Sequence, residues 1–145
     1  MAEKREQGKR KRRSRGFTLI ELLVVLVILG LVAAIAVPQV IKYVGSAKSD
    51  TARIQVERLA TTLDLYRLEV GRYPNDAEGL EALVERPPDA EAWNGPYLKE
   101  REISDPWGRP YVYVFPGEGG RDYGLSTLGA DGQEGGDGEN ADINY

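Results

Sequence analysis

The sequence contains neither cysteine nor histidine. Without cysteine, the chain has no disulfide bond, no thiolate metal site and no cysteine nucleophile. Without histidine, it lacks the commonest general base and the commonest ligand of transition metals. A metal site would have to be built from oxygen atoms, which favours calcium or magnesium. The length of 145 residues suits one small domain with an appendage rather than two full domains.

Charge is distributed unevenly along the chain. Residues 1–16 carry eight Lys/Arg and two Glu, a net charge of +6, whereas the remaining 11 basic and 21 acidic residues give −10. The basic residues directly precede an apolar run, so we interpret them as a signal for membrane topology rather than as a nucleic-acid surface. Positive flanks stay in the cytoplasm, which predicts that the C-terminal part of the chain lies on the outer side.

The apolar run extends from Phe17 to Val37, and Thr18 and Glu21 are its only strongly polar residues. At ~1.5 Å per residue, a helix of this length covers roughly 32 Å and can cross a bilayer core of ~30 Å. A conventional secretory signal peptide is the competing interpretation, with cleavage after the apolar run near Ala33–Ala36. The run is longer than a normal signal core and continues into an amphipathic helix without a loop.

The pattern after Lys42 is typical of an amphipathic helix. Apolar residues recur there at helical spacing, namely Ile54, Leu59, Leu63, Tyr66 and Val70. Gly71 is a natural stop. We therefore predict one long helix of about 50 residues, apolar all round in its first half and with a single apolar stripe in its second half.

The rest of the chain predicts short elements. A brief helix is expected over Glu78–Glu85, and a turn over Asp105–Pro110 in which Trp107 packs against a sheet. Residues Tyr111–Phe115 and Arg121–Thr127 are predicted to be two strands joined by a hairpin loop. The expected fold is α+β, with a small antiparallel sheet on the amphipathic part of the helix.

The segment Gly129–Asp142 contains five glycines and five acidic residues. It has no apolar anchor and would stay flexible alone, but calcium binds six to eight oxygens and would order it. The spacing is not that of an EF-hand, so a solvated acidic turn is the alternative.

Several motifs resemble a known family. The junction resembles the type IV pilin class signal, in the residues Arg15-Gly16-Phe17-Thr18-Leu19-Ile20-Glu21. Later motifs are similar to the major pseudopilin of type II secretion systems, namely Gly71-Arg72-Tyr73-Pro74, Glu78-Gly79-Leu80-Glu81-Ala82-Leu83, Asp105-Pro106-Trp107-Gly108 and Leu128-Gly129-Ala130-Asp131-Gly132. The resemblance implies a pilin-like fold with a leader over residues 1–16, a transmembrane and assembly helix over 17–42 and a periplasmic domain over 43–145.

The resemblance also implies roles for three residues at the junction. A prepilin peptidase would cleave after Gly16, and the new N-terminal residue, Phe17, would be N-methylated. A lone carboxylate in an apolar helix is costly in a membrane, and the resemblance implies that Glu21 pairs with the N-terminal amine of a neighbouring subunit. The alternative is a carboxylate at the membrane edge that reaches the headgroups.

In the major pseudopilin family the C-terminal loop binds calcium. Carried over to matching positions, this implies that Asp131 and Asp142 are side-chain ligands. Backbone oxygens of Leu128 and Gln133, and one near Glu139, would complete the shell.

The expected function is that of a structural subunit of the secretion pseudopilus, not an enzyme. The resemblance implies a homopolymer in the inner membrane, with further partners: minor pseudopilins, the prepilin peptidase, the inner-membrane assembly platform with its ATPase, and the outer-membrane secretin. Nucleic acid is not expected as a partner, because the periplasmic domain expected over residues 43–145 is acidic. The alternatives are a type IV pilin for adhesion or DNA uptake and a signal-anchored periplasmic enzyme.

Overall fold

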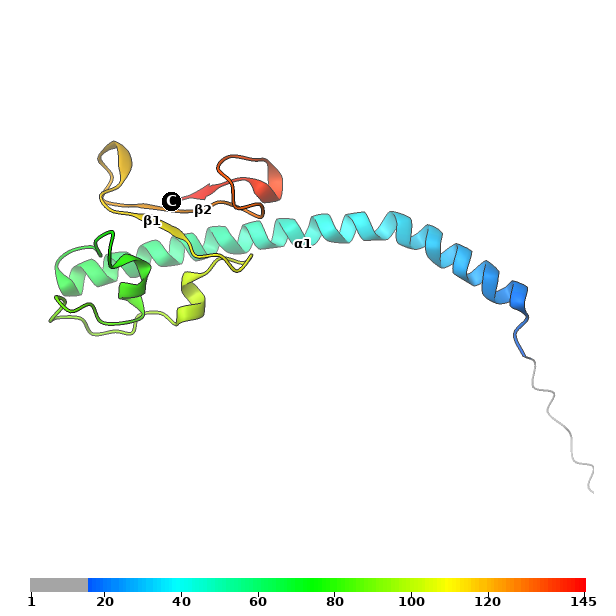
Figure 1. Cartoon of the computed structure of the whole chain (residues 1–145), viewed down its shortest axis with the longest axis horizontal. Coiled ribbons are helices and arrows are strands. Elements are labelled where there is room, and N and C mark those ends of the chain that lie inside the picture. Colours follow the sequence, from blue (N-terminus) through cyan, green and yellow to red (C-terminus); the bar gives the residue numbers. More distant parts are fainter. Residues whose placement is uncertain (1–15) are drawn as a thin grey trace, which may run out of the picture. The chain divides into compact units, whose positions relative to one another are not determined.

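The computed structural model describes residues 16–145, so the predicted leader lies outside the described residues except for Gly16. The chain divides into two compact units, Met1–Gln39 and Val40–Tyr145. A single helix of 52 residues, α1 (Leu19–Val70), runs through both and confirms the predicted long helix (Figure 1). Pro38 lies inside this helix.

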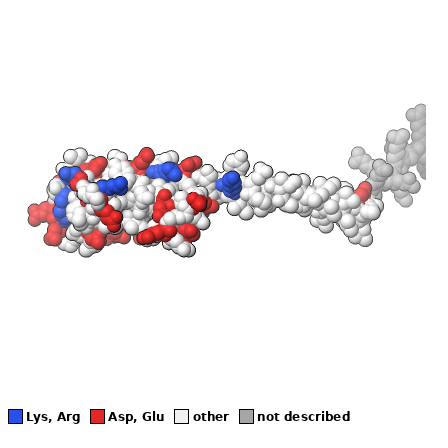
Figure 2. Space-filling view, turned by 90° about the horizontal axis from the view of Figure 1, so that it is seen from above, with Lys and Arg blue, Asp and Glu red and all other residues white. Residues whose placement is uncertain are grey.

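The described part of the first unit is an apolar helix that buries none of its large side chains. From Phe17 to Val37 every residue is exposed, and the most apolar window of α1 has a mean hydropathy of 3.1. By length and composition, α1 is able to cross a membrane. Figure 2 shows this stretch as an almost uncharged surface, whereas acidic side chains cover much of the visible face of the second unit.

The second unit has its core where the C-terminal part of α1 meets a sheet and two short helices. The buried residues of α1 are Gly45, Ala52, Val56, Leu59, Ala60, Leu63 and Tyr66. All of them except Gly45 pack against Leu80 and Leu83 of the 3₁₀ helix η1 (Gly79–Leu83) and against Leu125 and Ile143 of the sheet. A second 3₁₀ helix, η2 (Glu100–Ile103), precedes the Asp105–Pro110 turn.

The sheet has three antiparallel strands in the order β1-β2-β3: β1 (Val112–Val114), β2 (Gly124–Thr127) and β3 (Ile143–Asn144). Register pairs Tyr113 with Leu125 and Thr127 with Ile143 on the face toward the core. Val112 and Val114 are exposed. The alternation is that of a sheet with one buried face. The turn between β1 and β2 contains the 3₁₀ helix η3 (Glu118–Gly120), and η4 (Gly138–Asn140) precedes β3.

Three details differ from the sequence prediction. Ile54 was placed on the buried stripe but is 67 % exposed, because Val56 and Leu59 occupy the side of α1 that meets the core. The brief helix expected over Glu78–Glu85 is the shorter η1. The last strand, β3, was not predicted, because two residues carry no detectable alternation.

An ion pair joins the end of α1 to η1 across a tight turn. The Arg72 guanidinium donates to both carboxylate oxygens of Glu78, at 2.6 and 2.7 Å. The same carboxylate accepts the Asn75 amide at 2.8 Å, and the Asn75 side chain accepts the amides of Ala77 and Glu78. These contacts physically link two of the motifs on which the family resemblance depends.

The Arg72 hydrogen bonds lower the pKa of Glu78 below its ordinary value of 4.5, against the opposing effect of burial. A carboxylate with a lowered folded-state pKa stabilises the fold above its unfolded pKa and loses this contribution as pH falls through the folded value. We therefore expect Glu78→Gln to lower the free energy of unfolding by about 1 kcal/mol at pH 7. The difference from the unsubstituted chain should shrink as pH falls below about 4.5. Denaturant unfolding of the full chain in detergent between pH 7 and 3 measures both effects, and a difference independent of pH would contradict the assignment.

Candidate functional site

The first candidate site is the turn that begins α1. The Thr18 amide donates to the Glu21 carboxylate at 2.8 Å, and the Thr18 hydroxyl donates to the same oxygen at 3.1 Å. In return, the Glu21 amide donates to the Thr18 hydroxyl at 3.3 Å. This reciprocal pair is a capping box, which satisfies backbone donors that a helix start leaves free.

The capping box gives Glu21 a partner within its own chain. Gly16 and Phe17 precede it as exposed residues outside the helix, so the scissile bond predicted between them is on an accessible segment. The sequence analysis pairs Glu21 with a neighbouring amine or with the headgroups and does not predict its contact with Thr18. The signal was available, since Thr-x-x-Glu at the start of an apolar run is the capping-box pattern.

The second candidate site is the acidic loop, residues 129–142, between β2 and β3. Two of its carboxylates bind the same short stretch of backbone. Asp131 accepts the Gln133 amide at 3.1 Å, and Asp142 accepts the Gly135 amide at 2.8 Å. The predicted ligand side chains of Asp131 and Asp142 therefore both contact the backbone of residues 133–135.

Two glycines let the loop double back on Asn140. Gly129 and Gly136 have φ of +63° and +85°, a conformation that L side chains rarely adopt. A Cβ atom on either would lie 2.6 Å from the Asn140 main chain. Side chains larger than glycine are therefore excluded here by both strain and contact.

One oxygen of the loop has no partner. Asp142 Oδ1 is buried and accepts no hydrogen bond from any residue that the structure describes. Burial of an unpaired carboxylate oxygen is costly, and a bound cation would offset that cost. The oxygen-only donor set of this loop also fits calcium, although within residues 16–145 no three acidic side chains group in a way that would hold a metal.

The remaining predicted ligands have different positions. Leu128 is half-buried at the end of β2, and Gln133 is exposed. The Glu139 carbonyl accepts the Ala130 amide at 2.9 Å, while its carboxylate accepts the Trp107 indole N–H at 3.2 Å. The Glu139 side chain thus points to the Asp105–Pro110 turn.

That turn is fixed by Asp105, which the sequence analysis places in the turn without a hydrogen-bonding role. Its Oδ1 accepts the amides of Trp107 and Arg109 at 3.0 and 2.9 Å, and its Oδ2 accepts the Thr127 hydroxyl at 2.7 Å. Both Asp105 and Thr127 are buried. The Arg109 guanidinium in turn donates to the Gly129 carbonyl, so the turn holds the start of the acidic loop.

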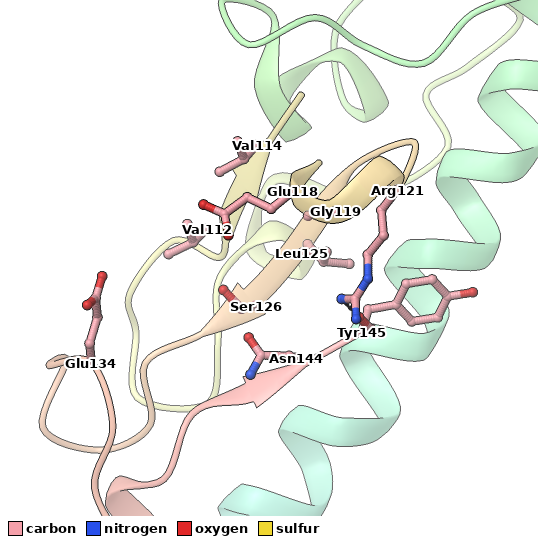
Figure 3. Close-up of a pocket in the computed structure, with 11 residues that line it drawn as sticks. Val112, Val114, Glu118, Gly119, Arg121, Leu125, Ser126, Glu134, Asn144 and Tyr145 are labelled. Carbon is pink, nitrogen blue, oxygen red and sulfur yellow. Dashed lines mark hydrogen bonds between the residues drawn. The ribbon is translucent and has the colours of Figure 1, made fainter. Parts of the chain in front are cut away.

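The outer face of the sheet forms a shallow hollow of about 610 Å³ (Figure 3). Val112 and Val114 of β1, Ser126 of β2 and Asn144 of β3 line it. Of the acidic loop, Glu134 alone reaches this hollow, so the Asp131 and Asp142 carboxylates belong to a separate region.

Comparison with known families gives a match over nearly all of the described chain. Residues 39–145 match the family model for "Type II secretion system (T2SS), protein G", and residues 11–37 match the "Prokaryotic N-terminal methylation motif". The chain belongs to the type II secretion protein G family. This family is that of the major pseudopilin, so the secretion-pseudopilin prediction is confirmed over the type IV pilin alternative.

Individual members of the protein G family agree with this assignment. The chain is 47% identical to the type II secretion system core protein G of Pseudomonas aeruginosa over 137 residues, which is 92% of this chain and 95% of the relative. It is 44% identical to that of Vibrio cholerae over 138 residues, 93% of each chain. The crystal structure of the major pseudopilin from enterohaemorrhagic Escherichia coli aligns with a TM-score of 0.57 at 31% identity, covering 68% of this chain and 82% of that one.

The α+β fold and the function expected of a protein G pseudopilin are thereby confirmed: the chain is a structural subunit of the type II secretion pseudopilus. Its apolar helix and N-terminal motif fit membrane anchoring as a component of that system.

Asp105 provides a test of how the site is held. Asp105→Ala removes three hydrogen bonds and leaves the buried Thr127 hydroxyl unpaired, so the free energy of unfolding should fall by about 2–3 kcal/mol. Asp105→Asn keeps one carbonyl oxygen for the two amides and an NH₂ group for Thr127, and should cost clearly less. Thermal unfolding of both variants measures the difference, and equal losses would argue against this hydrogen-bond role.

Proposed function

We propose that copies of this chain polymerise through the apolar half of α1 and that the resulting filament helps to export folded proteins across the outer membrane. The observation that carries the proposal is that every residue from Phe17 to Val37 is exposed. No part of the described chain covers this surface, so it requires lipid before assembly and neighbouring helices afterwards.

The part of α1 that belongs to the second unit offers further exposed apolar surface. Ile54 and Leu68 of α1 are 67 % and 81 % exposed, and Leu65 is also exposed. These side chains lie on the side of α1 away from its buried residues. They support contacts between the second units of neighbouring subunits, in addition to contacts between the apolar helices.

The proposal includes a maturation step at the start of α1. A prepilin peptidase removes the leader after Gly16, and the new amine of Phe17 is methylated. The match of residues 11–37 to an N-terminal methylation motif supports this step.

We propose that Glu21 exchanges its hydrogen bonds with Thr18 for an ion pair with a neighbouring subunit during assembly. In the isolated subunit Thr18 satisfies the carboxylate. In the filament, the Phe17 amine of a neighbour offers a full positive charge in apolar surroundings, where a charged partner is worth more than a neutral donor. The pairing would set the axial register between subunits.

Two variants separate processing from assembly. Gly16→Leu should leave the leader attached, because a peptidase needs close access to the scissile backbone and a side chain blocks it. Glu21→Ala should be processed normally but yield at least tenfold fewer filaments. The masses of the membrane-extracted subunits and the filament yield report the two steps separately. A mature-sized Gly16→Leu product, or normal filaments from Glu21→Ala, would contradict the respective role.

The proposal extends to the location of the subunit and to its partners. The subunit would reside in the bacterial inner membrane, with residues 43–145 in the periplasm, because the basic leader favours the cytoplasm. Assembly would need the inner-membrane platform with its ATPase, minor pseudopilins and the outer-membrane secretin. Neither an enzymatic activity nor nucleic-acid binding is part of this proposal.

We also propose that the acidic loop binds calcium. Asp131 and Asp142 would supply side-chain oxygens, and Leu128 and Gln133 backbone oxygens. A carbonyl near Glu139 would complete the shell, since a carbonyl oxygen has two lone pairs and can accept more than one partner. Calcium would hold a glycine-rich loop that has few apolar contacts of its own. The unpaired Asp142 Oδ1 supports this assignment.

Calcium should therefore raise the melting temperature of the full chain in detergent. At a concentration 100-fold above Kd, the expected stabilisation is about 2.7 kcal/mol. Asp142→Asn should remove most of this gain, whereas Glu134→Gln, a substitution in the same loop outside the proposed shell, should keep it. A calcium titration with no change in melting temperature would favour a solvated acidic turn.

A further inference from the structure

Gly45 is a buried glycine in the middle of α1, a position where glycine weakens a helix relative to alanine. A Cβ atom placed on Gly45 would come within 2.6 Å of Glu139 Cδ and 3.2 Å of Glu139 Cγ. The acidic side chain thus fills the space that a methyl group at residue 45 would take. Nothing comparable holds at Gly30, the other glycine of α1, where a Cβ would meet no atom within 4 Å.

The Glu139 side chain is held from a second direction as well. Trp107 donates its indole N–H to Glu139 Oε1 at 3.2 Å. Trp107 itself sits in the turn that Asp105 fixes, and its ring packs against the core. A main-chain hydrogen bond from Ala130 to the Glu139 carbonyl, at 2.9 Å, ties the two ends of the loop together at this point.

We infer that Gly45, Trp107 and Glu139 form a latch that fastens the acidic loop to α1. The missing side chain of Gly45 leaves space for the Glu139 carboxylate. The Trp107 indole donates a hydrogen bond to the same carboxylate. The latch contains no ion pair among the described residues. It therefore depends on the length and shape of the Glu139 side chain more than on its charge.

The latch gives Glu139 a role different from that of a metal ligand. Its carboxylate contacts Gly45 of α1 and the Trp107 indole, so it positions the loop. Asp131 and Asp142 instead accept hydrogen bonds from backbone amides of the loop. Because the same loop is proposed to bind calcium, this consequence rests on that proposed function. Ordering of the loop would then be transmitted directly to α1 at Gly45, shortly after the apolar segment ends.

A double-mutant cycle tests the latch without calcium. Thermal unfolding is measured on the full chain in detergent with a chelator present. The four forms compared are the unsubstituted chain, Glu139→Ala, Gly45→Ala and the double variant. Glu139→Ala should lower Tm by about 4–8 °C. Gly45→Ala should lower it by less, because the added methyl group displaces only the flexible end of Glu139 and alanine favours the helix. The double variant should melt no lower than Glu139→Ala alone, since the added methyl group then enters empty space and alanine favours the helix. Additive losses, or a higher Tm for Gly45→Ala alone, would overturn the latch.

Two conservative variants of Glu139 separate the effect of side-chain length from that of charge. Glu139→Gln keeps the side-chain length and an oxygen for the indole, so it should retain the Tm of the unsubstituted chain within about 2 °C. Glu139→Asp keeps the charge but is one methylene shorter, so it should lose as much as Glu139→Ala. The reverse order would show that charge holds the loop and would refute the latch.

A spectroscopic readout follows the indole directly. In a Trp93→Phe background, Trp107 is the only tryptophan. Its emission should shift to the red in Glu139→Ala and Glu139→Asp well below Tm, but not in Glu139→Gln. Unchanged emission in all three variants would contradict the Trp107 contact.

Calcium titrations of the same variants distinguish this proposal from the calcium proposal. Glu139→Gln should bind calcium within about twofold of the unsubstituted chain, and Asp142→Asn at least tenfold more weakly. A tenfold loss in Glu139→Gln with unchanged Tm in chelator would identify Glu139 as a metal ligand and overturn the latch. Absence of calcium binding in the unsubstituted chain would refute the calcium proposal alone, because the cycle in chelator decides the latch independently.

Discussion

The structure depends on an apolar helix that its own chain cannot cover. Full burial of each Val, Leu, Ile or Phe side chain is worth about 1.5–3 kcal/mol, and α1 exposes more than a dozen of these between Phe17 and Val44. The sum far exceeds the stability of a small domain. The segment therefore requires lipid or other apolar surfaces to cover it.

Within this segment, Glu21 illustrates how one polar group is accommodated. A free carboxylate would oppose insertion, but the capping box with Thr18 satisfies it locally at the helix start. The same carboxylate keeps lone pairs for a stronger donor. The carboxylate is thus satisfied within its own chain and keeps lone pairs that the proposed pairing with the amine of a processed neighbour would use.

Sequence reasoning found the features that depend on long periodic patterns. The helix, the β1–β2 hairpin and the family motifs were all predictable, since apolar periodicity and turn residues extend over many positions. The prediction failed for Ile54, because the angular position of one residue on a helix depends on which side the sheet occupies. It also missed β3, the role of Asp105 and the Glu139 contact with Gly45. Each of these joins residues far apart in the sequence, and a single chain carries no local signal for such pairs.

The short strand β3 has a consequence for how the C-terminus folds. Its two residues pair with β2, so the segment from Leu128 to Asp142 is a closed loop whose ends are joined by adjacent strands. The entropy lost in closing such a loop grows only slowly with its length, so its length can vary at little thermodynamic cost as long as the closure holds. The closure itself rests on the last residues of the chain, where the Tyr145 amide donates to the Leu125 carbonyl at 3.0 Å. Residues 143–145 therefore hold the acidic loop closed, and loss of their pairing with β2 would open the loop that directly precedes them.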